Sequence, residues 1–149
     1  MQVGVDYIGI STPFYCHDGK GRFVLHKRSL KCRDDYGVWD PGGGQLEFGS
    51  MAEENVLREV KEEYGCDGVI TDRLPTFSVF RDWDGKRTHW LAAPFFIQVN
   101  PKEVRINEPD KIDELGWFTL NSLPSPLHPG FVIALKNFPE CFKKYGRTI

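Results

Sequence analysis

Three glutamates that lie close together in the sequence are the side chains best suited to chemistry: Glu59, Glu62 and Glu63. In a helix over residues 51–64 they fall within an arc of roughly 100°, because successive helical residues are turned by about 100°. Like charges three and four residues apart repel each other by roughly 0.2–0.5 kcal/mol, and a bound cation would reverse that loss. Mg²⁺ prefers carboxylate oxygens together with phosphate oxygens and water, so the pattern predicts phosphate chemistry at a metal site.

The stretch that carries these glutamates has the features of a helix. No residue from 51 to 64 breaks a helix, and Gly65 follows where a C-terminal glycine is favoured. Ser50, with Glu53 three residues later, matches a capping box, so we expect the helix to begin there. Apolar side chains fill the arc beside the acids and predict one buried side: Val56, Leu57, Val60 and Tyr64.

A glycine-rich segment precedes the expected helix. Pro41 is followed by Gly42, Gly43 and Gly44. Three glycines after a proline stop regular structure and let the backbone approach a ligand closely. We therefore expect a loop beside the acidic side of the helix.

An isolated E-x-x-E-E pattern is usually a solvated helix surface, so the complete segment 44–66 decides between the two interpretations. Its fixed positions are Gly44, Ser50, Arg58, Glu59, Val60, Glu62, Glu63, Gly65 and Cys66. The segment resembles the Nudix box, Gly-x5-Glu-x7-Arg-Glu-U-x-Glu-Glu-x-Gly-U, in which U is a bulky aliphatic residue. The match covers the 23 residues of the box. A weaker resemblance extends over nearly the whole chain.

This resemblance implies a fold and a metal site. The fold would be the Nudix-type α/β/α sandwich, with a mixed β-sheet between helices, as a single domain over residues 1–149. Glu59, Glu62 and Glu63 would be metal ligands, and the carbonyl oxygen of Gly43 would be a further one. Mg²⁺ is the expected cofactor, with Mn²⁺ as a possible substitute.

Two positions depart from the box. Cys66 replaces the last aliphatic residue, which is a mild change because a buried thiol packs as a small hydrophobe. Ser50 replaces the first glutamate, which in the family helps position the arginine or lies near the metals, so Arg58 loses its usual partner. Our hypothesis is that Ser50 caps the helix while Glu47 supplies a nearby carboxylate.

Catalytic roles follow from the same resemblance. A downstream acid often completes the site or acts as the base, and Glu108, Asp110 and Glu114 are the candidates, with Glu108 favoured. The proton of the attacking water would go to Glu62 or Glu108, with Glu59 also possible. Arg58 would orient Glu59 or a phosphate by a charge-assisted hydrogen bond.

Several aromatic and basic residues are candidates for substrate contacts. Aromatic rings can stack on a base, although aromatic residues that alternate along strands are more often core. The aromatic candidates are Phe80, Trp83, Trp90, Trp117 and Phe118. Arg81, Lys86 and Arg87 could meet phosphates, although charges near a hairpin turn are usually solvated. Phe80, Arg81, Trp117 and Phe118 are taken forward as predicted substrate contacts.

The remaining sequence predicts a mixed α/β chain with one sheet. Residues 7–15 and 22–26 read as a hairpin, and residues 69–70 as a strand. Residues 76–81 and a long strand at 88–99 form a second hairpin around Asp84-Gly85. Residues 114–120 read as a short strand, and residues 131–137 begin a last helix.

Composition excludes several classes of protein. With a formal net charge of −2 and a pI near 6.1, the chain lacks the basic field expected for stable nucleic-acid binding. Its four cysteines are scattered, without metal-ligand spacing, which favours a reducing compartment. The N-terminus does not resemble a signal peptide and no apolar run is long enough for a membrane span. We therefore expect a cytoplasmic protein, as a monomer or homodimer.

The substrate expected is nucleotide-like. Segments 45–49 and 108–111 resemble those of small, MutT-like nucleoside triphosphate pyrophosphatases of the family, which would release monophosphate and pyrophosphate. Oxidised and non-standard nucleotides are among the candidate substrates. Cleavage of a nucleotide sugar or dinucleoside compound is the alternative with the same metal site. A non-catalytic nucleotide-binding regulatory domain on the same fold is the alternative from another class.

Overall fold

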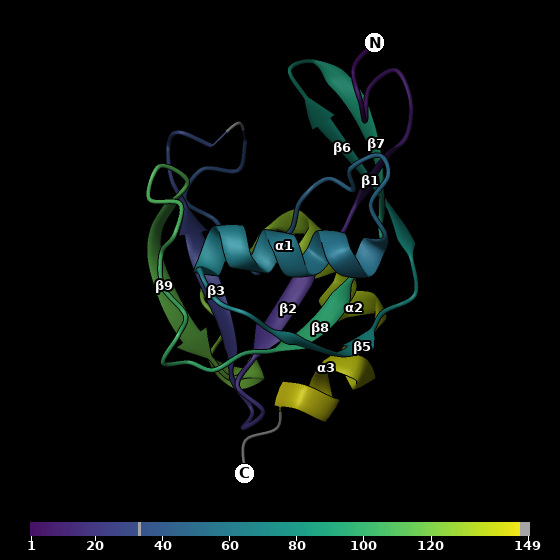
Figure 1. The fold of residues 1–149 in the computed structure, drawn as a ribbon. Helices are drawn as coiled ribbons and strands as arrows, with labels where there is room; N and C mark the ends of the chain where they lie inside the picture. The colour runs from purple at the N-terminus through teal and green to yellow at the C-terminus, as the bar shows by residue number, and fades with distance from the viewer. Residues whose placement is uncertain (33, 147–149) are drawn as a thin grey trace.

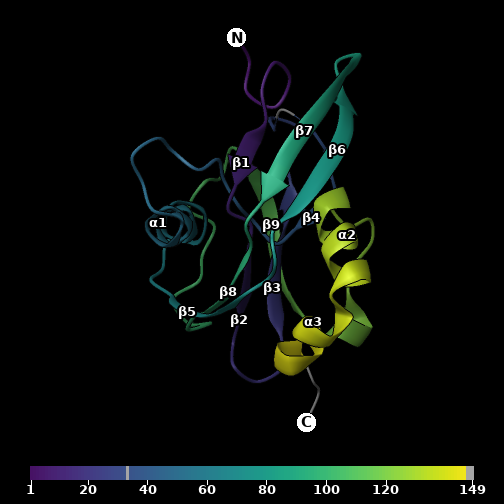
Figure 2. The same ribbon diagram turned by 90° about the vertical axis from the view of Figure 1, so that its right-hand side faces the viewer.

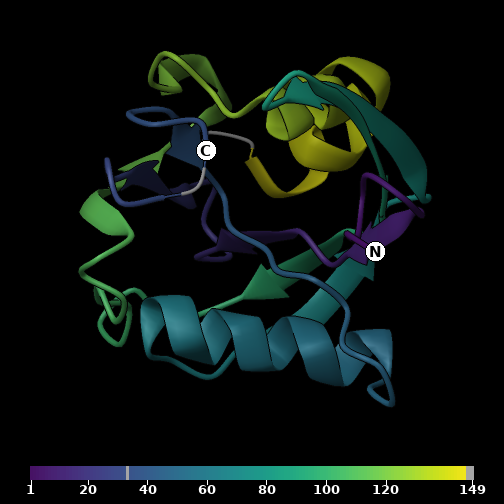
Figure 3. The same ribbon diagram turned by 90° about the horizontal axis from the view of Figure 1, so that it is seen from above.

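The computed structural model describes residues 1–32 and 34–146, and these form three layers. Helix α1 (Ala52–Tyr64) covers one face of a central sheet, and α2 (Pro129–Asn137) and α3 (Pro139–Gly146) cover the other (Figures 1, 2 and 3). The predicted α/β/α sandwich is therefore confirmed. The extension of this arrangement to one domain over residues 1–149 stays a prediction.

The central sheet is mixed. Its strands run in the order β4-β3-β2-β8-β5, and β9 also pairs with β3. β2 is parallel to β8, whereas the other pairs are antiparallel. The strands are β2 (Phe14–His17), β3 (Phe23–Arg28), β4 (Trp39–Asp40), β5 (Val69–Arg73), β8 (Phe95–Gln98) and β9 (Ile112–Phe118).

A second, three-stranded sheet extends beyond the central one (Figure 1). It contains β1 (Gly9–Ser11), β6 (Phe77–Trp83) and β7 (Lys86–Ala92), in the order β1-β7-β6. The prediction of one sheet was wrong, as was the continuous strand over residues 88–99. Pro94 separates β7 from β8 and Pro13 separates β1 from β2, and proline lacks the N–H that a continuous ladder needs.

Two apolar cores lie on opposite faces of the central sheet, because successive strand residues point to opposite sides. On β2, Phe14 and Cys16 face α1, whereas Tyr15 faces α2 and α3. The α1 core contains Phe14, Cys16, Val24, Val56, Val60, Tyr64, Cys66, Phe95, Ile97, Val99 and Ile112. The opposite core contains Tyr15, Phe23, Leu25, Leu74, Phe96, Phe131, Ala134 and Phe142.

Helix α1 ends as predicted but begins differently. Gly65 adopts a left-handed conformation (φ 67°) and donates its N–H to the Lys61 carbonyl at 2.9 Å. The predicted capping box is not formed, because Met51 occupies the N-cap without a side-chain hydrogen bond. Ser50 accepts a hydrogen bond from Arg58 instead, and Glu53 pairs with an arginine of β5.

The other predicted elements are found with shifted limits. The hairpin β2–β3 and the hairpin β6–β7, which turns at Asp84-Gly85, are both present. A short 3₁₀ helix (Leu120–Ser122) follows β9. In the described part of the chain, no helix has both the length and the apolar character required to cross a membrane.

His17 is a buried histidine at the end of β2. Its Nδ1 accepts the N–H of Gly19 at 3.2 Å, so Nε2 carries the hydrogen that is donated to Thr71 Oγ1 at 2.9 Å. Burial lowers the pKa of His17 to about 4. The folded protein therefore favours the neutral imidazole.

We predict that His17 makes stability depend on pH. An unfolded histidine binds a proton near pH 6.5, so the stabilisation from neutral His17 is complete above that pH and is lost as the pH falls towards 4. The free energy of unfolding should drop by at most about 3 kcal/mol over this window. Denaturant titrations should find a shallower pH dependence for His17→Gln, whereas His89→Gln, on the β6–β7 hairpin, should retain the wild-type slope. Identical slopes for all three proteins would contradict this assignment.

Candidate active site

The three predicted ligands on α1 lie in different surroundings. Glu63 is buried, with 8% of its surface exposed, whereas Glu59 is half-buried and Glu62 is exposed. Burial, together with the nearby charge of Glu62, raises the pKa of Glu59 to about 7. Burial also raises the pKa of Glu63 well above its ordinary value, and the charge of Asp40 adds to this effect. The site thus collects carboxyl groups that repel each other when ionised.

The glycine loop lies directly against two of these carboxyl groups. The N–H of Gly43 donates to the Glu63 carboxylate at 3.3 Å. The carbonyls of Gly42 and Gly44 accept the N–H groups of Phe14 and Thr12. Because the N–H and C=O of a trans peptide point in opposite directions, the Gly43 N–H points away from that segment, towards α1. A Cβ at position 44 would lie 2.3 Å from the side-chain carbon of the Glu59 carboxyl group. Glycine is therefore required at 44 for Glu59 to keep its position.

A buried polar network fixes the start of the glycine loop. Tyr64 donates its hydroxyl hydrogen to the Pro41 carbonyl at 3.0 Å. That hydroxyl then accepts from Nδ1 of His26, at 2.7 Å, because one hydroxyl supplies one hydrogen. α1, β3 and the loop are joined in this way. Tyr64 was predicted to lie in the core, but its polar role was not predicted.

A second network joins the N-terminal half of α1 to the other end of the loop. The amide of Asn55 is completely buried. Its nitrogen donates to Thr12 Oγ1 at 2.9 Å and to the Gln45 carbonyl at 3.1 Å. Its oxygen accepts from the Glu47 backbone and from Arg58. All four hydrogen-bonding positions of the amide are used. Sequence analysis missed Asn55, although a polar residue next to the apolar stripe of a helix was a usable signal.

Arg58 has acquired the partner that the sequence analysis suggested. Its guanidinium lies 3.3 Å from the Glu47 carboxylate and 3.4 Å from Ser50 Oγ. Glu47 is thus placed where it can hold Arg58. The Arg58–Glu47 ion pair is partly exposed, so solvent screens it and its contribution to stability is small.

Of the three downstream acids, Glu108 lies beside the α1 carboxyl groups. Its charge is among those that raise the pKa of both Glu59 and Glu63. All three acids also lie near lysine side chains: Asp110 near Lys31, Glu114 near Lys27, and Glu108 at 3.9 Å from Nζ of Lys111. The role of Glu108 as the acid that completes the site stays a prediction.

The donor chemistry of this site fits a hard divalent cation. Carboxylate oxygens dominate it, and the Gly43 N–H contacts one of these carboxylates, whereas the Gly43 carbonyl as a ligand stays a prediction. As the side chains stand, residues 1–32 and 34–146 contain no group of three or more His, Cys, Asp or Glu arranged to hold a metal ion. The side chains of the predicted ligand set must therefore move closer together to hold a cation.

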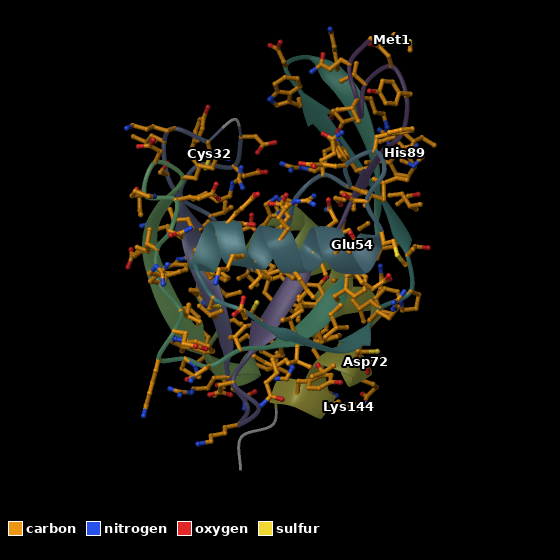
Figure 4. The ribbon with its side chains drawn as sticks, in the orientation of Figure 1. Met1, Cys32, Glu54, Asp72, His89 and Lys144 are labelled. Carbon is orange, nitrogen blue, oxygen red and sulfur yellow. The ribbon has the colours of Figure 1, made fainter. Side chains whose placement is uncertain are left out.

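A cleft of about 290 Å³ borders the glycine loop. Gly43 and Gly44 form part of its lining, so the cleft and the carboxyl groups share a wall. Asp34, in the loop after β3, and residues of the β6–β7 hairpin also line the cleft. Figure 4 labels Cys32 in that loop and His89 in that hairpin. Apolar and aromatic side chains dominate the rest of the lining: Tyr15, Phe77, Val79, Trp83, Trp90 and Phe131.

Ion pairs form the polar part of the cleft. Arg81 lies 2.6 Å from the Asp35 carboxylate, and Nε2 of His128 lies 3.4 Å from the same group. Although burial alone would raise it, hydrogen bonds from His128 and Arg81 lower the pKa of Asp35 to about 2. Arg28 similarly pairs with Asp40 at 3.1 Å. The cationic groups of the cleft are thus neutralised locally.

The structure brings only some of the predicted substrate contacts to this cleft. Arg81 lines it. Phe80 points to the opposite face of its hairpin, where it stacks with His89. Trp117 packs on the α1 core and Phe118 on the opposite core, and neither lines the cleft.

The candidates Trp83 and Trp90 do line the cleft. Trp90 lies across Gly9 of the neighbouring strand, where a Cβ would be 2.6 Å from its ring. Successive residues of β6 point to opposite faces of its sheet, so Val79 and Arg81 line the cleft whereas Phe80 does not. The sequence shows this alternation but does not show which face is turned towards the cleft.

Comparison with solved structures gives the class of fold. The chain is similar to a MutT NUDIX hydrolase from Burkholderia pseudomallei, with a TM-score of 0.78 and 29% sequence identity. The match covers 89% of this chain and 99% of that one. An acid-bearing helix against a glycine loop thus occurs here on a Nudix fold.

The sequence model of the NUDIX domain matches residues 9–138, and the chain belongs to the NUDIX family. The predicted resemblance to MutT-like Nudix hydrolases is confirmed.

Two relatives illustrate how much the similar proteins differ in their named activity and in the share of the chain that they match. An isopentenyl-diphosphate Delta-isomerase of Brevibacterium linens is 32% identical over 136 residues, covering 85% of this chain and 74% of the relative. A putative mutator protein MutT4 of Mycobacterium tuberculosis (strain CDC 1551 / Oshkosh) is 29% identical over 90 residues. That match covers 60% of this chain, and this chain spans only 36% of the MutT4 protein.

We predict that Gly44→Ala weakens metal binding without unfolding the protein. The added Cβ would displace the Glu59 carboxyl group, and loss of a carboxylate donor should lower Mn²⁺ affinity by about 10-fold or more. Titrations followed by electron paramagnetic resonance (EPR) would measure this. Gly49→Ala is the control, because position 49 has open space but a φ of 86°, so it costs stability only. Equal affinities for wild type and Gly44→Ala would contradict the placement of Glu59 in the metal site.

We predict that Glu47 substitutes for the glutamate missing at position 50. Ser50→Glu should raise Mg²⁺ affinity, and Glu47→Gln should lower it by about 2- to 5-fold, as expected for a partly exposed ion pair. In the Ser50→Glu background, Glu47→Gln should have little further effect, because Arg58 then has another partner. Calorimetric titration with Mg²⁺ would test this. An unchanged affinity in Ser50→Glu would defeat the hypothesis.

Proposed function

We propose that this protein hydrolyses a nucleoside triphosphate to a monophosphate and pyrophosphate, with Mg²⁺ as its cofactor. The observation that carries the proposal is the shared wall between the two halves of the site. Gly43 and Gly44 touch the carboxyl groups of Glu63 and Glu59 and also line the apolar cleft. A ligand in the cleft therefore extends its phosphates towards the acids.

The cleft suits the nucleoside part of such a substrate. Its volume is close to the lower limit of about 300 Å³ for small-molecule sites. Trp83 and Trp90 offer ring faces for stacking with a base. Arg81 and His128 are already paired with Asp35, so this end of the cleft favours an uncharged, hydrogen-bonding group over a phosphate.

The acidic side of α1 suits the phosphates. When bound through Glu59, Glu62 and Glu63, a divalent cation would neutralise phosphate oxygens and make water more acidic. Glu108 would take the proton of the attacking water on a carboxylate oxygen. The water oxygen then forms a bond to the α-phosphorus as the bond from that phosphorus to the pyrophosphate leaving group breaks. Arg58, held by Glu47, would keep the neighbouring Glu59 in position.

Further features of the proposal come from the sequence. Mn²⁺ would be able to substitute for Mg²⁺ in the site, because carboxylate and phosphate oxygens coordinate both ions. The protein would act in the cytoplasm as a monomer or homodimer, without stable binding to nucleic acid.

Other activities would give different products in one assay. Cleavage of a nucleotide sugar would release a nucleoside monophosphate and a sugar phosphate, and cleavage of a dinucleoside polyphosphate would release two nucleotides that share its phosphates. An isomerase acting on a diphosphate ester, as the relative from Brevibacterium linens is named, would leave the diphosphate intact. A regulatory domain would bind a nucleotide tightly without turnover.

The test is product analysis on a panel of nucleoside triphosphates, nucleotide sugars, dinucleoside polyphosphates and isopentenyl diphosphate, with and without Mg²⁺. We expect monophosphate and pyrophosphate from a triphosphate, only when Mg²⁺ is present. Glu62→Gln should lower kcat by at least about 100-fold, because it removes a metal ligand. Glu54→Gln is the matched control, since Glu54 is also exposed on α1 (Figure 4).

Two results would overturn the proposal. One is turnover of a triphosphate that does not depend on Mg²⁺ or on Glu62. The other is the absence of monophosphate and pyrophosphate with every triphosphate, while another member of the panel is converted or bound.

A further inference from the structure

The segment that follows β8 returns to the C-terminal end of α1 and lies against it. The four last carbonyl groups of a helix have no partner within the helix. In α1 these carbonyls belong to Lys61, Glu62, Glu63 and Tyr64. Two residues from a distant part of the chain, Arg105 and Asn107, donate hydrogen bonds to all four, and the Lys61 carbonyl also accepts the N–H of Gly65.

Asn107 makes most of these contacts. Its side-chain nitrogen donates to the Glu62 carbonyl at 2.9 Å and to the Lys61 carbonyl at 3.3 Å. Its backbone N–H donates to the Glu63 carbonyl at 3.1 Å. Both side-chain partners are carbonyl oxygens, so the amide must present its nitrogen to them. An amide donor also suits the negative end of the helix dipole.

Arg105 completes the attachment of this segment. Its N–H donates to the Tyr64 carbonyl at 3.0 Å. Its guanidinium lies over Gly65, where a Cβ would be 2.7 Å from the central guanidinium carbon. Gly65 therefore serves both to end α1 and to leave room for the arriving segment.

The attachment determines where Glu108 lies, since Glu108 directly follows Asn107. On its other side, the Glu108 carbonyl accepts the N–H groups of Lys111 and Ile112, each at 3.0 Å. The backbone of Glu108 is therefore held from both directions. Because the N–H of Asn107 is bonded to the Glu63 carbonyl, Glu108 lies next to the end of the helix from which Glu59 and Glu63 project.

We propose that Asn107 is a positioning residue, which ties the segment 105–108 to the end of α1 so that the Glu108 carboxylate faces the metal-binding acids. This inference rests on the proposed function, in which Glu108 receives the proton of the attacking water. Asn107 itself touches neither substrate nor cation. Its effect on metal binding and turnover passes through Glu108.

The experiment is a double-mutant cycle of Asn107→Ala and Glu108→Gln, read by Mn²⁺ affinity in EPR titrations and by kcat. Glu108→Gln should weaken Mn²⁺ binding because it removes a negative charge from the site. Asn107→Ala should weaken it by about 2- to 10-fold, the range that one or two lost hydrogen bonds allow. It should lower kcat by a similar factor and leave KM within 2-fold. In the Glu108→Gln background, Asn107→Ala should change neither quantity by more than 2-fold.

The control is Asn100→Ala. Asn100 is an exposed asparagine earlier in the same connection, and its side chain accepts a local hydrogen bond from the Lys102 backbone. We expect Asn100→Ala to match the wild type in Mn²⁺ affinity and kcat. Amide hydrogen exchange at residues 105 and 107 should accelerate in Asn107→Ala only, since these N–H groups are bonded to α1.

Failure of this inference differs from failure of the proposed function. Two results would overturn the role of Asn107. One is that the effects of Asn107→Ala and Glu108→Gln multiply in the double variant. The other is that amide hydrogen exchange at residues 105 and 107 is unchanged in Asn107→Ala. A wild type that binds Mn²⁺ but hydrolyses no triphosphate would overturn the proposed function. The Mn²⁺ cycle and the exchange rates would then still decide whether Asn107 positions Glu108.

Discussion

The close approach of the glycine loop to α1 is the constraint on which the site depends. Gly43 donates its N–H to the buried Glu63 carboxylate, and Gly44 leaves the space that the Glu59 carboxyl group occupies. Any side chain at position 44 would push the Glu59 carboxyl group away from the backbone of the glycine loop. Burial raises the pKa of both carboxyl groups, and the hydrogen bond from Gly43 offsets this effect only in part and only for Glu63. The arrangement is therefore understandable as a binding site and is difficult to explain as a stabilising feature.

Polar contacts hold α1 to three segments of the chain that are distant in sequence. Asn55 joins its first half to residues 45–47, and Tyr64 joins its last turn to Pro41. Asn107 caps its C-terminal end and brings Glu108 to the acids. Apolar packing places the helix on the sheet, whereas these directional contacts fix the loops around it.

The sequence predicted those features that depend on local pattern. The helical conformation of α1 and its end at Gly65 follow from periodicity and glycine chemistry, whereas its start was expected at Ser50 and the N-cap is Met51. The Nudix box identified its acids. The split of residues 88–99 into two strands was missed, because a strongly apolar run outweighed the signal from Pro94. Asn55, Asn107 and the Asp35–Arg81–His128 group depend on contacts between distant segments. No local pattern encodes such contacts, and for the same reason the cleft-facing side of β6 was not predictable.

The central claim is that the carboxyl groups of α1, held against the glycine loop, bind a divalent cation beside the cleft. Crystals soaked with Mn²⁺ and a non-hydrolysable nucleoside triphosphate would test it most directly, through anomalous scattering from the metal. The account predicts a peak about 2.0–2.4 Å from oxygens of Glu59 and Glu63, with the triphosphate reaching it from the cleft. A metal peak elsewhere, or a nucleotide bound outside the cleft, would contradict it.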